Sequence, residues 1–254
     1  MFLSVFDIFK IGIGPSSSHT MGPMIAASRF LVELRSIAVP LPGKERPSRL
    51  SASLHGSLAF TGKGHATDRA VMLGLLGFLP ETLDPDAAEH LEADLRRSGF
   101  IDVAGIGQLA FSPQSDLVFD YGPPLPGHAN GLILSAFDQF GSLVLRRTYY
   151  SIGGGFVVTE DEIAGRHATA SAAEALAACP FPFSNAAQML AMGHATGLSI
   201  AEMKRRNELA ISGAGLDSRL HQIWHAMNDC IERGLRKDGI LPGGLHVRRR
   251  ARAL

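Results

Sequence analysis

The densest set of reactive side chains lies between Lys10 and Met24, in the stretch KIGIGPSSSHTMGPM. Three consecutive serines, His19 and Thr20 stand between glycines and prolines, which predict a sharp loop. Pro23 suits the first turn of a helix, and free N–H groups at a helix start favour a carboxylate or phosphate. The stretch therefore predicts a site for a small polar ligand. An ordinary loop with a serine or threonine cap would have a similar sequence.

A second group of polar residues follows an alternating segment. From Leu50 to Thr61, apolar residues alternate with polar ones, which is typical of a strand with one polar face. His55 and Ser57 are expected on the same side of this strand, directly before a Gly-Lys-Gly loop that ends in His65. Loops at strand ends are common positions for binding sites. A solvated sheet face without a function would show the same alternation.

Helical periodicity places both loops at the starts of helices. Apolar residues three and four positions apart predict an amphipathic helix over Pro23–Ile37, and a nearly continuous apolar run predicts a buried helix over Asp68–Phe78. An acidic surface helix is expected over Pro85–Ser98. Ser4–Phe9 is expected to be a short strand or a helical turn, and residues 38–47 a loop. A buried helix would hold the loop before it rigidly.

Three strands are predicted in the middle of the chain. Leu117–Tyr121 is a short strand, and Gly131–Asp138 and Ser142–Ile152 form an antiparallel pair joined by a tight turn. The pair leads into three glycines, 153–155, which permit a backbone to approach a ligand or another loop closely. A simple bend would contain the same glycines.

The composition changes after Thr159, where alternation stops and alanine, methionine and charged residues become frequent. This change indicates a domain boundary. Helices are predicted over Ser184–Ala195, Ser199–Ile211 and Asp217–Arg233, the first two with serine caps. Asn207 lies on the middle helix, where a polar asparagine is usually exposed.

The composition of the whole chain narrows the classes of function. At roughly 150 residues per domain, the 254 residues suggest two domains, and 46% apolar residues suffice for a core. The formal net charge is zero, so neither nucleic acid nor a membrane surface is expected as a partner, and the arginines near residue 250 are expected to be solvated. Cys179 and Cys230 form no metal-ligand pattern and are expected to be buried thiols. The chain has no run long enough for a membrane span and no secretion signal, so a cytoplasmic protein is expected.

Five motifs in order resemble the iron–sulfur L-serine dehydratases of bacteria, in their single-chain form. The motifs are GPSSSHTMGP at 14–23, HGSLAFTGKGHATD at 55–68, YYSIGGG at 149–155, Asn207–Glu208 and LPGG at 241–244. They extend over almost the whole chain and correspond to the front half of the family pattern. The resemblance implies an α+β N-terminal domain with an antiparallel or mixed sheet and packed helices over 1–160. It further implies a linker at 161–182 and the opening helices of an all-α catalytic domain over 183–254. In that family the first domain is similar to the allosteric substrate-binding domain of some phosphoglycerate dehydrogenases.

The resemblance also implies a reaction. The family members are lyases that eliminate water from L-serine to give pyruvate and ammonia, in amino-acid catabolism and gluconeogenesis. They use a four-iron four-sulfur cluster held by three cysteines and no pyridoxal phosphate. Those cysteines should follow Leu254, and Cys230 is not one of them, so this chain is expected to hold no metal and to need a cluster-bearing part.

Three origins would produce such a sequence: a truncated enzyme, a split gene or an expressed fragment. In each case the opening helices should expose apolar surface, so association is expected, either as a homodimer or with a cluster-bearing alpha part.

Roles for single residues follow from the resemblance as well. His19 and His65 are the candidates for proton transfer, since an imidazole titrates near neutral pH. His19 is preferred as the base, although spacing alone cannot identify it. The other residues are expected to bind or orient L-serine: Ser16, Ser17, Ser18, Thr20, His55, Ser57, Thr61, Asp68 and Asn207. The alternative is a non-catalytic module that binds an amino acid or a hydroxy acid through the same serine loop.

Overall fold

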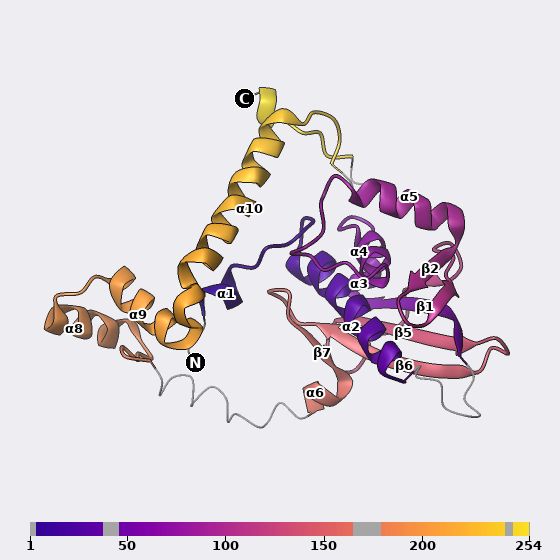
Figure 1. The fold of residues 1–254 in the computed structure, drawn as a ribbon, viewed down its shortest axis with the longest axis horizontal. Coiled ribbons are helices and arrows are strands. Elements are labelled where there is room, and N and C mark those ends of the chain that lie inside the picture. The colour runs from indigo at the N-terminus through magenta and orange to yellow at the C-terminus, as the bar shows by residue number, and fades with distance from the viewer. Residues whose placement is uncertain (1–3, 38–45, 165–178, 242–245, 254) are drawn as a thin grey trace. The chain divides into compact units, whose positions relative to one another are not determined.

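The computed structural model describes residues 4–37, 46–164, 179–241 and 246–253 (Figure 1). Contacts divide the chain into two compact units. The sheet unit comprises Gly12–Ala164 and Gly239–Arg249, and the helical unit comprises Met1–Ile11, Gly165–Asp238 and Arg250–Leu254. The loop predicted at 38–47, the linker predicted at 161–182 and the LPGG motif at 241–244 lie wholly or partly outside the described residues. The domain limits expected at 160 and 183 stay a prediction.

A sheet of mixed direction organises the sheet unit (Figure 1). Within the described residues it has seven strands in the order β2–β3–β1–β5–β6–β7, and β4 also pairs with β1. Strand β1 is antiparallel to β5 and parallel to β3 and β4. The strands are β1 Pro47–Gly56, β2 Phe100–Val103, β3 Gly107–Ala110, β4 Leu117–Asp120, β5 Asn130–Asp138, β6 Leu143–Ser151 and β7 Val157–Thr159. The predicted α+β class, the mixed sheet and the antiparallel β5–β6 pair are confirmed.

Helices α2 and α4 lie side by side over one face of this sheet (Figure 1). Their close approach depends on Gly74 of α4, because a Cβ atom there would lie 2.3 Å from the carbonyl oxygen of Met24 in α2. The amphipathic and the buried helix predicted from periodicity are both confirmed. The helices of the unit are α2 Gly22–Ile37, α3 Ser57–Phe60, α4 Thr67–Leu75, α5 Ala88–Ser98 and α6 Glu160–Ala164.

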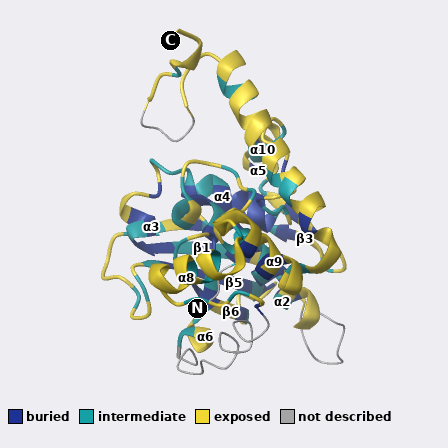
Figure 2. Cartoon of the chain, turned by 90° about the vertical axis from the view of Figure 1, so that its left-hand side faces the viewer, coloured by how far each residue is buried: buried dark blue, intermediate teal, exposed yellow. Residues whose placement is uncertain are grey.

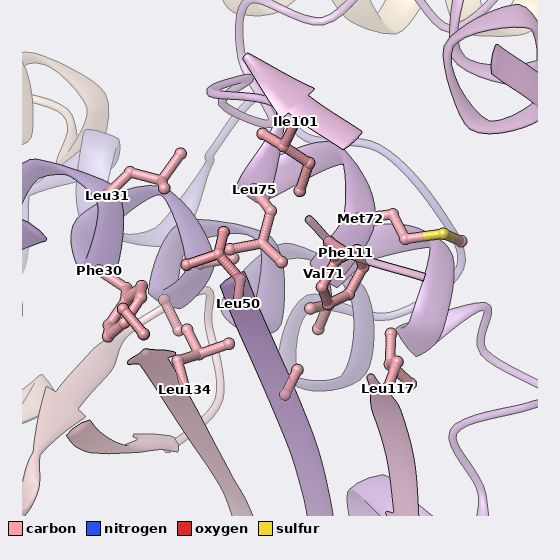
Figure 3. Packing of buried hydrophobic residues seen from close by; sticks show 14 of the residues in the cluster. Phe30, Leu31, Leu50, Val71, Met72, Leu75, Ile101, Phe111, Leu117 and Leu134 are labelled. Carbon is pink, nitrogen blue, oxygen red and sulfur yellow. The ribbon is translucent and has the colours of Figure 1, made fainter. Parts of the chain in front are cut away.

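The hydrophobic core fills the space between α2, α4 and the sheet. Figure 3 shows Phe30 of α2, Leu75 and Val71 of α4 and Leu134 of β5 around Leu50 of β1, and each of the five is at most 1% exposed. Burial of a side chain of this size contributes about 1.5–3 kcal/mol. The layer is therefore a rigid base for the loops at the end of β1.

Strand β1 ends earlier than its alternation predicted. The expectation that the strand continues to Thr61 is wrong, because Ser57 already begins α3. The turn is made by Gly56, with φ 57° and ψ −130°, where a Cβ atom would lie 2.3 Å from the carbonyl oxygen of Ala129. Only glycine fits this conformation and this contact. His55 and Ser57 consequently do not project from one strand face.

The helical unit contains α1 Val5–Ile8, α8 Ala186–Thr196, α9 Ile200–Ser212 and α10 Leu216–Arg236. The three helices predicted after residue 183 are confirmed, and a helical turn is the correct alternative for Ser4–Phe9. Ser199 caps α9 in a capping box with Glu202. Helix α8 is capped by Asn185 rather than by the predicted serine, because the Asn185 side chain accepts the N–H of Gln188.

Asn207 on α9 is buried, contrary to the expectation for a polar residue on such a helix. It is 1% exposed, and both ends of its amide bind the backbone of Phe181. The Phe181 N–H donates to Oδ1 at 2.7 Å, and Nδ2 donates to the Phe181 carbonyl at 2.8 Å. Asn207 therefore holds the segment before α8 against α9.

Glu208 performs the same task for the N-terminal segment. Its carboxylate accepts hydrogen bonds from the Ser4 hydroxyl, the Val5 N–H at 3.1 Å and the Ser212 hydroxyl at 3.0 Å. Burial alone would raise the pKa of Glu208, but these hydrogen bonds and the Lys204 ammonium together lower it. The charged carboxylate thus ties α1 to α9.

Helix α10 presents an apolar row formed by Trp224, Met227, Ile231 and Leu235, which are 48–57% exposed. Their spacings of three and four residues place them on one side of the helix, which is largely exposed in Figure 2. Cys230 on the same helix is also exposed, so the prediction of a buried thiol is wrong for Cys230. Among the described helices, none combines the length and hydropathy needed to cross a bilayer.

Candidate active site

Two loops of the sheet unit bring His19 and His65 together. Their ring centroids are 4.7 Å apart, and the ring planes are inclined by 37°. His19 lies in a π-helical turn, Ser17–Met21, that runs directly into α2. His65 lies in the turn between α3 and α4. The two histidines that the sequence proposed for proton transfer therefore share one site.

The π-helical turn depends on capping and on close packing. The Ser16 hydroxyl accepts the N–H of His19 at 3.2 Å, and the Ser16 carbonyl accepts the N–H of Thr20 at 3.0 Å. Gly14, with φ 83°, leaves room for Thr20, whose Cγ2 would lie 2.4 Å from a Cβ atom at that position. Such turns are rare in proteins, and those that occur are often at functional sites.

Ser151, from the YYSIGGG motif, lies against the end of this turn. A Cβ atom at Gly22 would lie 2.0 Å from Ser151 Oγ, so only glycine fits there. Ser151 is fully buried, and among the described residues its hydroxyl has no hydrogen-bond partner. Its carbonyl accepts a hydrogen bond from Asn130 Nδ2 at 3.1 Å. The motif therefore supports the serine loop by packing.

Both ring nitrogens of His19 face serine hydroxyls. Nδ1 lies 2.9 Å from Ser18 Oγ, and Nε2 lies 3.0 Å from Ser57 Oγ. Since a hydroxyl can donate or accept, either neutral tautomer fits. Burial lowers the pKa of His19, the neighbouring His65 lowers this pKa further, and the hydrogen bond with Ser57 acts in the opposite direction. The imidazole of His19 is therefore neutral at pH 7.

The hydrogen bond of His65 determines its tautomer. Nδ1 lies 2.9 Å from the carbonyl oxygen of Thr61. Because a carbonyl oxygen only accepts, Nδ1 must carry the proton. In neutral His65 the lone pair is then on Nε2, which has no hydrogen-bond partner among the described residues. This nitrogen can accept a proton from a ligand.

The remaining predicted hydroxyl and carboxylate groups near this pair differ in what they can still bind. Ser17 is exposed, and Ser18 lies 3.4 Å from Ser16, oxygen to oxygen. The hydroxyl of Thr61, which caps the end of α3, donates to the Ser57 carbonyl at 2.8 Å. Asp68 Oδ1 accepts the N–H of Arg69 at 3.0 Å, and Oδ2 lies 3.6 Å from Lys63 Nζ. The structure gathers nine predicted residues here: Ser16, Ser17, Ser18, His19, Thr20, Ser57, Thr61, His65 and Asp68.

His55 belongs to a different cluster. Its Nε2 lies 2.8 Å from Ser53 Oγ, and its Nδ1 lies 3.5 Å from Asp120 Oδ2 on the neighbouring strand β4. Burial lowers the pKa of His55, while Asp120 raises it and Arg146 lowers it. No hydrogen bond or ring contact within the described residues joins His55 to the paired histidines. Its role toward a substrate stays a prediction.

Asn207 and Thr67 make hydrogen bonds that the sequence did not predict. Asn207 lies in the helical unit with its amide bound to Phe181, and its predicted role at the substrate is untested. Thr67 was missed, although its hydroxyl donates to the carbonyl oxygen of His19 at 2.6 Å. Its place at the end of the 55–68 motif, directly before the predicted buried helix, was the signal that could have identified it.

Sequence comparisons relate the chain to known proteins. The family model described as serine dehydratase beta chain matches residues 4–162. Over 252 residues the chain is 42% identical to an L-serine dehydratase of Streptomyces coelicolor, and over 253 residues it is 40% identical to L-serine dehydratase TdcG of Escherichia coli. These alignments cover 99% of this chain but 54% and 53% of the two relatives. The chain thus spans about half the length of the curated relatives it matches.

The residues of this chain do not fit a four-iron four-sulfur cluster. Such a cluster is held mainly by cysteine thiolates. The chain has two cysteines, Cys179 and Cys230, and among the described residues no three His, Cys, Asp or Glu side chains gather in a metal-binding group.

The family model matches more than half of the sequence, and the matched residues include the whole histidine site. The chain therefore belongs to the serine dehydratase beta-chain family.

Proposed function

We propose that this chain is the part of an L-serine dehydratase that binds L-serine and transfers protons while water is eliminated to give pyruvate and ammonia. The observation that carries the proposal is the pairing of His19 and His65 beside the serine loop, at 4.7 Å between ring centroids. The names of the relatives support the substrate and the reaction class.

His65 is the proposed base for the α-proton of L-serine. Its Nδ1–H is held by the Thr61 carbonyl, which leaves the lone pair on Nε2 for the substrate. A positioned base of this kind typically accelerates a reaction by about 10²–10⁴. The geometry thus favours His65 over His19, the residue that the sequence analysis prefers as the base.

His19 is the proposed partner of this base. After proton transfer His65 is a cation, and a second cation 4.7 Å away would oppose that step. The lowered pKa of His19 avoids this repulsion, because burial keeps its ring neutral. Neutral His19 can donate one hydrogen bond to the substrate, in place of the bond to Ser18 or Ser57.

The serine loop is the proposed site for the substrate carboxylate. Ser17 is exposed, and it begins a helical turn whose first N–H groups lack intrahelical acceptors. Ser18 adds a hydroxyl beside His19. An anion at such a turn is favoured by both the N–H groups and the helix dipole.

The departing hydroxide requires chemistry that this chain does not supply. An iron–sulfur cluster in a separate alpha part is the proposed cofactor, and it would act as a Lewis acid. The apolar row on α10 supports association with such a part.

A cytoplasmic location and a role in amino-acid catabolism and gluconeogenesis belong to the same proposal.

A chimera tests the proposal directly. In it, residues 1–254 replace the matching half of the Streptomyces coelicolor relative, which keeps its own remaining sequence. Anaerobically reconstituted chimera should form pyruvate from L-serine but not from D-serine. Visible absorption of the cluster provides the control for correct assembly.

Two results would count against the proposal. A chimera that holds its cluster and binds no L-serine would contradict it completely. Binding of L-serine without pyruvate would instead favour the alternative of a non-catalytic module for an amino acid or a hydroxy acid.

A further inference from the structure

Two threonine hydroxyls cross between the histidine loops. Thr20, directly after His19, donates from Oγ1 to the carbonyl oxygen of His65 at 3.0 Å. Thr67, two residues after His65, donates from Oγ1 to the carbonyl oxygen of His19 at 2.6 Å. Each loop therefore provides a donor for the backbone of the histidine in the other loop.

Neither hydroxyl has a proton left to donate to a ligand. Thr20 is 5% exposed and Thr67 is 0% exposed, and each hydroxyl proton is already used on a carbonyl. Loss of either donor would leave a buried carbonyl oxygen without this partner, which costs free energy. We therefore favour a positioning role for Thr20 over the predicted binding of substrate through its hydroxyl.

The elements behind the two threonines are rigid. Thr67 is the first residue of α4, and Thr20 lies in the turn that leads into α2. These helices pack closely at Gly74. The two crossed bonds extend this contact up to the backbone of the histidines, so the positions of both rings depend on them.

We propose that Thr20 and Thr67 form a reciprocal clamp that sets the separation and inclination of the His19 and His65 rings and does not bind substrate. Its consequence for catalysis rests on the proposed function. The clamp itself is a property of this chain and can be tested without turnover.

The titration of His19 is a readout of ring position. Burial and the nearby His65 lower the pKa of His19, and both effects weaken if the rings separate. Other charged groups on the His65 turn, Lys63 and Asp68, lie 3.6 Å from each other and stay unchanged in every variant below.

The first experiment is an NMR titration of the imidazoles in the full 254-residue chain. Thr67→Val and Thr20→Val should each raise the pKa of His19 toward its ordinary value. Thr67→Ser and Thr20→Ser keep the hydroxyl and should titrate as the unchanged chain does. Thr196→Val is the matched control, because Thr196 also donates to a carbonyl, that of Met192 at 2.7 Å, but in the helical unit.

The outcomes separate the clamp from a general loss of structure. Folded valine variants with an unchanged His19 pKa would overturn the clamp. If Thr67→Val does not fold, Thr20→Val and the two serine variants still test whether the clamp sets the His19 pKa. A serine variant that titrates like its valine counterpart would also overturn the role of the hydroxyl.

The second experiment measures turnover of L-serine in the chimera. The valine variants should lose about tenfold in kcat with little change in KM, and the serine variants should recover it. A raised KM with unchanged kcat in Thr20→Val would overturn the clamp in favour of substrate binding. A shifted His19 pKa without loss of kcat would overturn the role of the clamp in catalysis. If the unchanged chimera forms no pyruvate, the proposed function fails, while the titration still tests the clamp.

Discussion

The sheet unit contains two histidine clusters that differ in how completely their hydrogen bonds are satisfied. His55 is buried between Ser53 and Asp120, and both of its nitrogens face these two side chains of the sheet. His65 has one nitrogen bound to a carbonyl and one without a partner among the described residues. The comparison teaches that an available lone pair, rather than a histidine in a motif, distinguishes a candidate base from a structural residue.

The charges around the clusters differ as well. Asp120 raises the pKa of His55 against the effect of burial. His19 has a second histidine beside it, which adds to the effect of burial and lowers its pKa. The first arrangement suits a stable hydrogen-bonded cluster of the sheet. The second keeps His19 neutral, so that His19 does not oppose protonation of the neighbouring His65.

The largest expected difference is in turnover. In the chimera, His65→Gln should lower kcat/KM for L-serine by about 10²–10⁴, since the base for the α-proton is lost. His55→Gln should cost less than about tenfold, because no hydrogen bond or ring contact within the described residues joins His55 to the paired histidines. Pyruvate formation measures both. Equal losses in the two variants would erase the distinction between the clusters.

The packing under the His19 turn should have the next largest effect. Gly22→Ala places a Cβ atom 2.0 Å from Ser151 Oγ and should lower the free energy of unfolding of the chain by about 1–3 kcal/mol. Gly234→Ala on α10 is the matched control, because nothing lies within 4 Å of that position. Denaturant titration measures both variants. Adding Ser151→Gly to Gly22→Ala should restore most of the loss, and no recovery would mean that the contact is not the cause.

Acid should weaken the fold through both clusters. A histidine whose folded pKa is lowered releases its proton on folding, so the unfolded chain binds more protons. The stabilisation contributed by neutral His19 and neutral His55 is therefore fully present above about pH 6.5, which is the pKa of histidine in the unfolded chain. It is lost as the pH falls through the lowered pKa values of the folded chain. Denaturant titrations between pH 5 and 8 should show that the free energy of unfolding rises with pH, because the unfolded chain binds protons at two histidines that the folded chain keeps neutral. His19→Gln and His55→Gln should each flatten this rise, and a rise that survives in the double variant would refute the assignment.

The smallest expected effect tests whether the two histidine clusters titrate independently. Asp120→Asn removes the charge that raises the pKa of His55, so this pKa should fall further below its ordinary value. Stability should change by about 1 kcal/mol or less, because the Asp120 side chain is 47% exposed and the contact is long. NMR titration of the imidazoles measures the shift. The pKa of His19 should not move, and a parallel shift of His19 would mean that the clusters are coupled.

Much of the fold could be predicted from local patterns. Periodicity located α2, α4, α9 and α10 within a few residues, since each has a continuous helical pattern. The β5–β6 pair was found from alternation and a tight turn. Strands β2 and β3 were missed, whereas β4, which is equally short, was predicted as the strand Leu117–Tyr121. The end of β1 was missed because Gly56 breaks the strand without breaking the alternation of residue types.

By itself the sequence determined the α+β class, most helices, the family resemblance and the set of groups that could transfer protons. Only the tertiary structure decided which of these groups meet. It separated His55 from His19 and His65, left Nε2 of His65 without a partner among the described residues, and occupied the hydroxyls of Thr20 and Thr67. The physical reason is that the hydrogen bonds of Thr20 and Thr67 and the contact between the His19 and His65 rings join loops distant in sequence, so they depend on how α2, α4 and β1 pack.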